Sequence, residues 1–236
     1  MKLFKRIFPE KPELHGWIAL AAIILMNTIV YYSSRLITAS GFHYDFTTPI
    51  DLKIPFIPAF ILVYSVLGYL QWIIGYYWSS CEDKKTVFFI FGAEIIAKVP
   101  SMVIFLLIPT TMTRPEITGT DFFSVLVKGL YFLDSPDNLF PSFHCLESYI
   151  LLRTLPMLKK APTWYKKLTP FVSPLVIISI LFVKQHLIVD IIGGIAVSEF
   201  GLLTMRIAYK ALSKNSNPII NKKRTDNISI LAVEDK

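Results

Sequence analysis

The stretch VFFIFGAEIIAKVPSMVIFLLIP, residues 87–109, decides the fold of this 236-residue chain. Only two of its side chains carry a charge, Glu94 and Lys98. A helix of this length can cross the hydrocarbon core of a bilayer, which is roughly 30 Å thick. Because that core contains no water, a spanning segment must satisfy its backbone hydrogen bonds internally, as a helix does. The stretch therefore predicts a membrane-spanning helix.

The composition of the whole chain agrees with a membrane protein. Hydrophobic residues make up 53% of the chain, 17% of residues are charged, and the mean hydropathy is +0.53. Soluble domains average about 25% charged residues. The net charge of +7 lies mainly in short loops and tails, where it sets topology, and this argues against a nucleic-acid partner. Two cysteines, Cys81 and Cys145, indicate no disulfide framework.

Apolar runs of spanning length recur along the chain and predict six helices. The predicted spans are residues 17–37, 55–78, 87–109, 142–158, 168–183 and 187–209. The expected fold class is therefore all-α, a polytopic six-transmembrane-helix bundle. We expect a single membrane domain over residues 17–209, between a cytoplasmic segment at 1–16 and a polar cytoplasmic tail at 210–236.

The lysines and arginines predict the orientation of the bundle. Most of them lie in the N-terminal segment, the second and fourth loops and the C-terminal tail, which share one side of a six-span layout. The opposite side has only Lys53, Arg114, Lys128 and Lys184. Positive charge accumulates on the cytoplasmic side, so we expect both termini there, in a multi-pass protein of the cell membrane.

The third loop, residues 110–141, is long and is expected on the extracytoplasmic face. Its middle part, residues 121–134, is apolar but too short to span a bilayer. We expect an interfacial helix there. An amphipathic lid packed on the bundle explains the same pattern equally well.

Charged residues inside the predicted spans indicate an internal cluster. Glu94 and Lys98 lie on one face of a helix because they are four residues apart, and Glu199 lies at a similar depth in the last span. Intramembrane charges are commonly functional, but this depth is far from the outer face. We therefore expect a structural ion pair or cluster. Glu147 follows His144 within one helical turn and could support that histidine.

The stretch LFVKQHLIVD, residues 181–190, brings a cation, an imidazole and a carboxylate to the start of the last span. His186 and Asp190 are one helical turn apart. The carboxylate can fix the imidazole tautomer and leave the other ring nitrogen as a nucleophile or base. A pair that serves packing alone is the alternative, but a carboxylate in an apolar helix start favours a function.

A second polar cluster opens the fourth span and contains Ser142, Phe143 and His144. Ser142 suits an N-cap, and a helix start offers free backbone N–H groups to an anion. A lone histidine such as His144 more often caps or packs. Arg114 adds a planar fork of donors and Lys184 a compact charge on the same face. Together these groups predict an anion-binding pocket with two histidines, suited to phosphoryl transfer by a covalent route. These cations and the lack of a metal-binding motif argue against a metal ion.

These residues resemble the motifs of the phosphatidic acid phosphatase type 2 superfamily, which includes lipid phosphatases and vanadium haloperoxidases. The three motifs correspond here to RP at 114–115, PSFH at 141–144, and a Ser, a Lys-Gln-His and an Asp between 179 and 190. The chain departs from the family at Leu107 and Ile180, where the family has Lys and Arg, and it gains Lys184. Its Lys-Gln-His form resembles the branch that holds inositol phosphorylceramide synthases.

The resemblance implies a role for each of these residues. His186 attacks phosphorus and forms a phosphohistidine, Asp190 orients it, and His144 protonates the leaving oxygen and then activates water. The implied phosphate-binding groups are Arg114, Lys184, Ser142 and the backbone near Phe143. The resemblance implies neither a metal nor another cofactor.

The function expected from this resemblance is that of a metal-independent lipid phosphatase acting at the outer membrane face. Its substrate is a lipid phosphomonoester or diphosphate, and its other partners are membrane lipids. The alternative is a phosphotransferase that moves a phospho-head group between lipids, and a non-enzymatic membrane transporter is a third interpretation. The identity of the lipid and the oligomeric state stay open.

Overall fold

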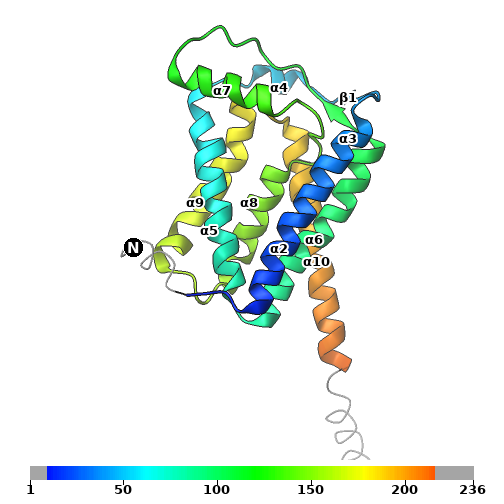
Figure 1. Cartoon of the computed structure of the whole chain (residues 1–236), viewed down its shortest axis with the longest axis vertical. Helices are drawn as coiled ribbons and strands as arrows, with labels where there is room; N and C mark the ends of the chain where they lie inside the picture. The colour runs from blue at the N-terminus through cyan, green and yellow to red at the C-terminus, as the bar shows by residue number, and fades with distance from the viewer. Residues whose placement is uncertain (1–9, 216–236) are drawn as a thin grey trace, which may run out of the picture.

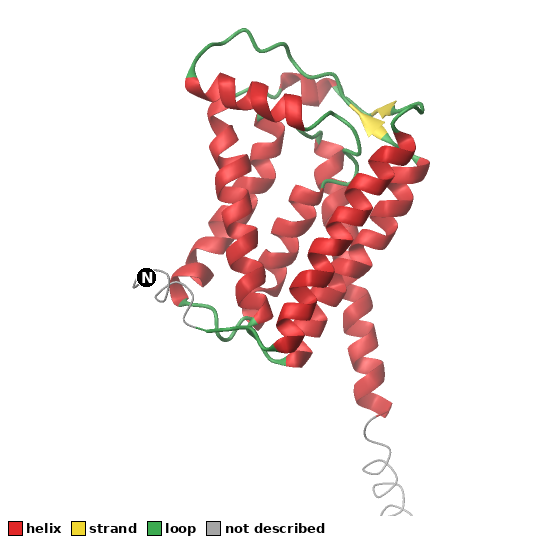
Figure 2. Cartoon of the chain, viewed as in Figure 1, coloured by secondary structure: helices red, strands yellow, loops and turns green. Residues whose placement is uncertain are grey.

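The computed structural model describes residues 10–215, and the regular secondary structure of that part of the chain is helical apart from one pair of short strands (Figures 1 and 2). The helices are α2 (Leu14–Thr28), α3 (Ser34–Thr38), α4 (Pro49–Lys53), α5 (Gly68–Ser80), α6 (Lys84–Leu107), α7 (Phe122–Leu133), α8 (Phe143–Thr154), α9 (Thr163–Phe182) and α10 (Ile188–Asn215). The strands are β1 (Tyr44–Asp45) and β2 (Thr110–Thr111). Short π-helical and 3-10 segments add to these helices at Ile29–Ser33, Pro58–Phe60, Leu62–Leu67 and Leu155–Met157. The predicted all-α class is confirmed.

Five helical segments among residues 10–215 are long and apolar enough to cross a membrane. They are Leu14–Thr38, Pro58–Ser80, Lys84–Leu107, Thr163–Phe182 and Ile188–Leu212. Large apolar side chains on these segments are exposed on the outside of the bundle, including Leu36, Ile73, Phe171 and Leu203. Lipid solvates such a surface, whereas water would not. The chain is therefore a multi-pass membrane protein.

The remaining predicted span, residues 142–158, corresponds to α8 and the 3-10 turn that follows it. At 1.5 Å per residue these elements extend for roughly 22 Å, which is less than the other five. α8 packs against α5, α6, α9 and α10, and its residues Leu146, Ile150 and Leu151 are buried. Helix length alone therefore does not confirm the six-span count. The last predicted span is longer than expected, because α10 continues beyond residue 209 to Asn215.

Hydrogen bonds between loops define the two ends of the bundle. At one end the Lys160 N–H donates to the Glu82 carboxylate over 2.7 Å, and His15 Nε2 lies 3.2 Å from the Glu82 carbonyl oxygen. At the other end β1 pairs in parallel with β2, matching Tyr44 with Thr110. Helices α4 and α7 lie across the bundle at this second end (Figure 1). We call it the α4–α7 end.

α7 fills the middle of the long loop, as predicted. Asp121 caps it by accepting hydrogen bonds from the N–H groups of the first turn. Val127 is buried in a cluster that includes Val183, whereas Phe132 and Leu133 are 87% and 78% exposed. The helix therefore packs on the bundle with one side and presents apolar side chains on the other.

A buried ion cluster lies between α6 and α8. Lys98 donates to Glu94, and its Nζ lies 2.8 Å from Glu147 Oε1. The side chains of Glu94 and Lys98 have no exposed surface, so the predicted internal ion pair is confirmed. Glu199 is not a member of this cluster. The Glu199 Oε1 atom instead lies 2.7 Å from Arg153 Nε, and both side chains are partly exposed. The prediction for Glu199 was wrong because the depth of a residue in the membrane does not determine the direction in which its side chain points around the helix.

Candidate active site

His186 and Asp190 meet at the junction of α9 and α10. Asp190 lies in the first turn of α10, and His186 precedes that helix by two residues. The His186 Nδ1 atom is 3.2 Å from Asp190 Oδ2, and the Asp190 side chain is 1% exposed. A carboxylate only accepts hydrogen bonds, so the Nδ1 position carries the proton and Nε2 keeps a free lone pair. The predicted contact between the two side chains is confirmed.

The start of α8 lies against the same junction. Ser142 is the N-cap of α8, since its Oγ accepts a hydrogen bond from the Cys145 N–H over 3.3 Å. The Ser142 N–H donates to the Asp190 carbonyl oxygen over 3.1 Å. The second and third sequence motifs are therefore joined by a backbone hydrogen bond, although they are about fifty residues apart in the chain.

His144 faces His186 from the first turn of α8, with 5.9 Å between the ring centroids. Its other neighbours are aromatic. Tyr64 stacks on the His144 ring at 4.3 Å, and the Trp72 ring lies at 4.9 Å. The His144 Nε2 atom is buried and has no hydrogen-bond partner. A buried ring nitrogen of this kind is available to a group that enters between the two histidines.

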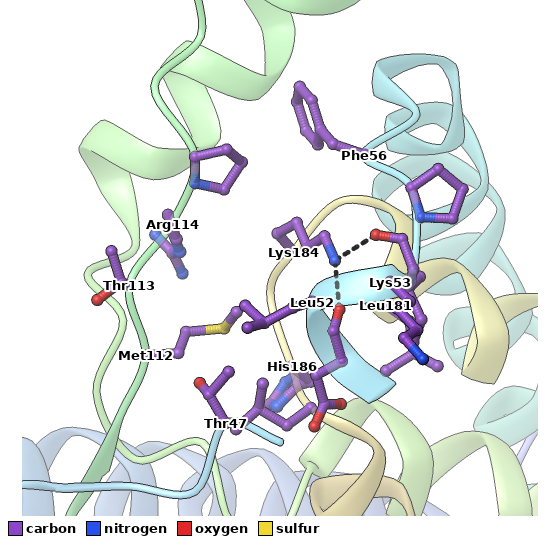
Figure 3. A pocket seen from close by; sticks show the side chains of 15 residues that line it. Thr47, Leu52, Lys53, Phe56, Met112, Thr113, Arg114, Leu181, Lys184 and His186 are labelled. Carbon is purple, nitrogen blue, oxygen red and sulfur yellow. Dashed lines mark hydrogen bonds between the residues drawn. The ribbon is translucent and has the colours of Figure 1, made fainter. Parts of the chain in front are cut away.

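A cavity of about 480 Å³ opens beside His186 at the α4–α7 end. Arg114 and Lys184 line it from two different segments, together with the apolar side chains Leu52 and Met112 (Figure 3). Arg114 and Lys184 thus share a cavity with His186, as predicted. The cavity lining holds only part of the predicted site, because it does not include Ser142, Phe143, His144 or Asp190.

Arg114 is held in place by three contacts. Its Nη1 donates to the Asp134 carbonyl oxygen over 2.5 Å, and its Nη2 donates to Gln185. The guanidinium lies 4.4 Å from the centroid of the Tyr131 ring. Burial lowers the pKa of Arg114, while the nearby Asp134 raises it. A guanidinium stays protonated at any physiological pH. Arg114 therefore supplies a fixed positive charge next to residues 183–187, the loop between α9 and α10 that we call the His186 loop.

Lys184 has partners that sequence reasoning did not predict. Its ammonium donates to the carbonyl oxygens of Asp51, over 2.9 Å, and Ile54, over 2.6 Å, at the end of α4 (Figure 3). Its backbone is left-handed, with φ at 52°. Burial lowers the pKa of this ammonium, and the Asp51 carboxylate opposes that change. Lys184 therefore lines the predicted pocket, but two of its donors are occupied by the protein.

Asp51 was not identified from the sequence as part of the site, although the sequence around it carries a signal for a helix start. Thr48, Pro49 and Asp51 form a capping box with proline at the first helical position, which marks the start of α4. Asp51 is 4% exposed. Nothing in that signal indicates that the same carboxylate also contacts the start of α10, because its partner Ile188 is 137 residues away in the chain.

The motif residues of the chain thus gather at one end of the bundle. Ser142, His144, His186 and Asp190 contact one another directly or through ring packing. Arg114 lies on the adjoining cavity. Among residues 10–215, no group of three or more His, Cys, Asp or Glu side chains is placed to hold a metal ion. No family model, curated protein or solved structure matches this chain.

Proposed function

We propose that this chain is an integral membrane lipid phosphatase that cleaves a lipid phosphomonoester or diphosphate through a phosphohistidine. The observation that carries the proposal is the His186–Asp190 pair, whose imidazole faces that of His144 with 5.9 Å between ring centroids. Two imidazoles at this separation can act on one phosphoryl group, one as the nucleophile and the other as the acid and base.

The reaction has two steps in this proposal. His186 Nε2 attacks phosphorus while the bond from phosphorus to the lipid oxygen breaks, and that oxygen takes a proton from His144. Water then attacks the phosphohistidine and gives a proton to His144, and the phosphorus–nitrogen bond breaks to release phosphate. Asp190 holds the Nδ1 proton of His186 and stabilises the positive charge that develops on the ring.

The proposed phosphate-binding groups surround this pair. Arg114 and Lys184 supply positive charge on the cavity side, and Ser142 and Phe143 supply the start of α8. An ammonium has three donors, so Lys184 retains one after its two bonds to carbonyl oxygens. Phosphoryl oxygens held between the cavity and α8 would meet donors from both sides.

We further propose that the α4–α7 end is extracytoplasmic and that both termini are cytoplasmic. The opposite end holds Lys84 and Lys85 at the start of α6 and Lys159 and Lys160 in the loop before α9, as the positive-inside rule requires. In this topology α8 is the fourth of six crossings, and it can be short because neighbouring helices cover it. α7 is the interfacial helix, with Phe132 and Leu133 directed into lipid.

The topology is tested by labelling single cysteines in intact cells, with Cys81 and Cys145 replaced. Thr118 and Lys159 are both exposed and lie in loops at opposite ends of the bundle. A membrane-impermeant thiol reagent should label the Thr118→Cys protein in intact cells, and the Lys159→Cys protein only after lysis. The reverse pattern would mean that the proposed active site faces the cytoplasm.

The function is tested by measuring phosphate release from a panel of lipid substrates by the purified full-length protein. The panel contains phosphatidate, phosphatidylglycerophosphate and polyprenyl diphosphate, each with and without a lipid alcohol as acceptor. We expect phosphate release from at least one lipid, at a rate that a chelator leaves unchanged. A phosphorylated alcohol in place of free phosphate would identify a phosphotransferase. No turnover of any lipid by folded protein would refute both assignments.

A further inference from the structure

Helix α4 is bound to the His186 loop on both sides of the histidine. Two residues before His186, the Lys184 ammonium donates to the carbonyl oxygens of Asp51 and Ile54. Two residues after it, the Ile188 N–H donates to Asp51 Oδ1 over 2.8 Å. A five-residue helix from the loop between the first two membrane helices thus bridges the segment that carries the proposed nucleophile.

Asp51 is the centre of this bridge. One carboxylate oxygen accepts from the Ile188 N–H, and the other accepts from the Thr48 N–H over 2.9 Å and the Thr48 hydroxyl over 2.5 Å. Although burial raises the pKa of Asp51, the hydrogen bonds from Thr48 and Ile188 lower it below its usual value. The group is therefore a carboxylate, and hydrogen bonds to a carboxylate are stronger than those between neutral groups.

The N–H groups that open α10 have no partners within that helix, and two carboxylates accept from them. Asp190 Oδ2 accepts from the Leu187 N–H over 2.8 Å, and Asp51 accepts from the next N–H, that of Ile188. Negative charge at a helix start is favourable. The carboxylate that orients the His186 ring and the carboxylate from α4 therefore bind adjacent peptide groups.

The conformation of the loop depends on such support. Lys184 has a left-handed backbone, which costs a residue with a side chain more than it costs glycine. A helix as short as α4 has little stability of its own. α4 and the His186 loop therefore hold each other in place. Loss of the hydrogen bond from Ile188 to Asp51 should loosen both segments.

We infer that Asp51 is a positioning residue for His186, which it holds at its working geometry through the Ile188 N–H and α4. This inference rests on the proposed function and assigns Asp51 no contact with the substrate. A nucleophile displaced by about 1 Å can lose about 100-fold in rate, while substrate binding by other groups persists.

The test compares three variants of the full-length protein with wild type, on the lipid that the panel identifies. In the Asp51→Ala protein we expect kcat and the rate of phosphohistidine formation to fall by about 100-fold, with KM within about threefold of wild type. In the Asp51→Asn protein the amide oxygen can still accept from the Ile188 N–H, so the loss should stay within about tenfold. The matched control is Asp45→Ala, since Asp45 is exposed and its carboxylate accepts a hydrogen bond from the nearby Thr47 N–H, far from the His186 loop in sequence. The rate of this variant should be unchanged.

A further variant separates positioning from the capping of α4. Thr48→Val removes the hydroxyl of the capping box but leaves the Asp51 carboxylate free to bind the Ile188 N–H. We expect it to keep most of the activity. If kcat falls as much in Thr48→Val as in Asp51→Ala, Asp51 is not a positioning residue. The same conclusion follows if kcat of Asp51→Ala is within threefold of the wild-type value.

Hydrogen exchange gives a readout that does not depend on turnover. In the peptide covering residues 183–190, Asp51→Ala should speed amide exchange by about tenfold, whereas Asp45→Ala should leave it unchanged. If wild type cleaves no lipid, the proposed function fails, and unchanged exchange in Asp51→Ala would separately refute the bridge. If Asp51→Ala does not fold, the comparison of Asp51→Asn with Thr48→Val decides. A larger loss of activity in Thr48→Val than in Asp51→Asn would assign the effect to the capping of α4 and overturn the inference.

Discussion

The His186→Ala protein should have no measurable turnover and should carry no acid-labile phosphate. Loss of a nucleophile typically lowers kcat by about 10⁴-fold or more, because the remaining groups cannot form the covalent intermediate. In wild-type protein, rapid quenching after mixing with phosphorus-labelled substrate should trap label that acid releases. The same experiment with His186→Ala should trap none.

His144 should act on both steps, and this gives a second variant with a different outcome. The His144→Ala protein should turn over slowly, because one imidazole serves the leaving oxygen and the attacking water. A substrate with a good leaving group does not need the proton from His144. With such a substrate the first step should recover while hydrolysis stays slow, so label should accumulate on His186.

His43 provides a matched control for both histidine substitutions. It lies at the same end of the bundle, and its Nδ1 atom is 3.1 Å from the Gly41 carbonyl oxygen. The His43→Ala protein should keep wild-type turnover and labelling. If fully active wild-type protein traps no label, and a chelator stops its turnover, the phosphohistidine mechanism is wrong and a metal-dependent hydrolase should be considered instead.

Short-range patterns were sufficient to predict several parts of the site. Ser142 caps α8, and the four-residue spacing of His186 and Asp190 brings their side chains together. The cap depends on neighbours within one helical turn, so the sequence alone specifies it. The His186–Asp190 contact is also local in the sequence, but His186 precedes α10, so the two side chains do not share one helix face. The sequence predicts the length of a membrane span less well than these local features. α8 is covered by other helices, so it need not extend as far as a helix that faces lipid.

Contacts between distant segments were not predictable in this way. The position of Lys184, two residues before His186, predicts that its ammonium binds phosphate. In the structure this ammonium donates to two carbonyl oxygens of residues about 130 positions away in the chain. Every residue carries a carbonyl, so no sequence signal marks these partners. Glu147 joins Lys98 in the membrane for a similar reason, since packing decides which carboxylate faces the lysine.

The Lys98→Met protein should be strongly destabilised. Lys98 pairs with Glu94 and Glu147, and all three are fully or almost fully buried. Tyr76 and Asn27 also donate hydrogen bonds to Glu147, so the cluster joins α2, α5, α6 and α8. Removing the one cation leaves two buried carboxylates without a charge partner. Breaking a buried ion pair from one side typically costs about 3–5 kcal/mol.

The measurement is reversible unfolding of the purified protein in mixed micelles, with Lys128→Met as the matched control. Lys128 is an exposed cation on α7, so its replacement should change the free energy of unfolding by no more than about 0.5 kcal/mol. Replacing the whole cluster, with Glu94→Gln, Lys98→Met and Glu147→Gln together, should restore most of the lost stability, because neutral amides need no cation. A Lys98→Met protein as stable as Lys128→Met would contradict the assignment. Since Glu147 lies one turn after His144 on α8, the triple variant should also recover phosphohistidine labelling that Lys98→Met loses.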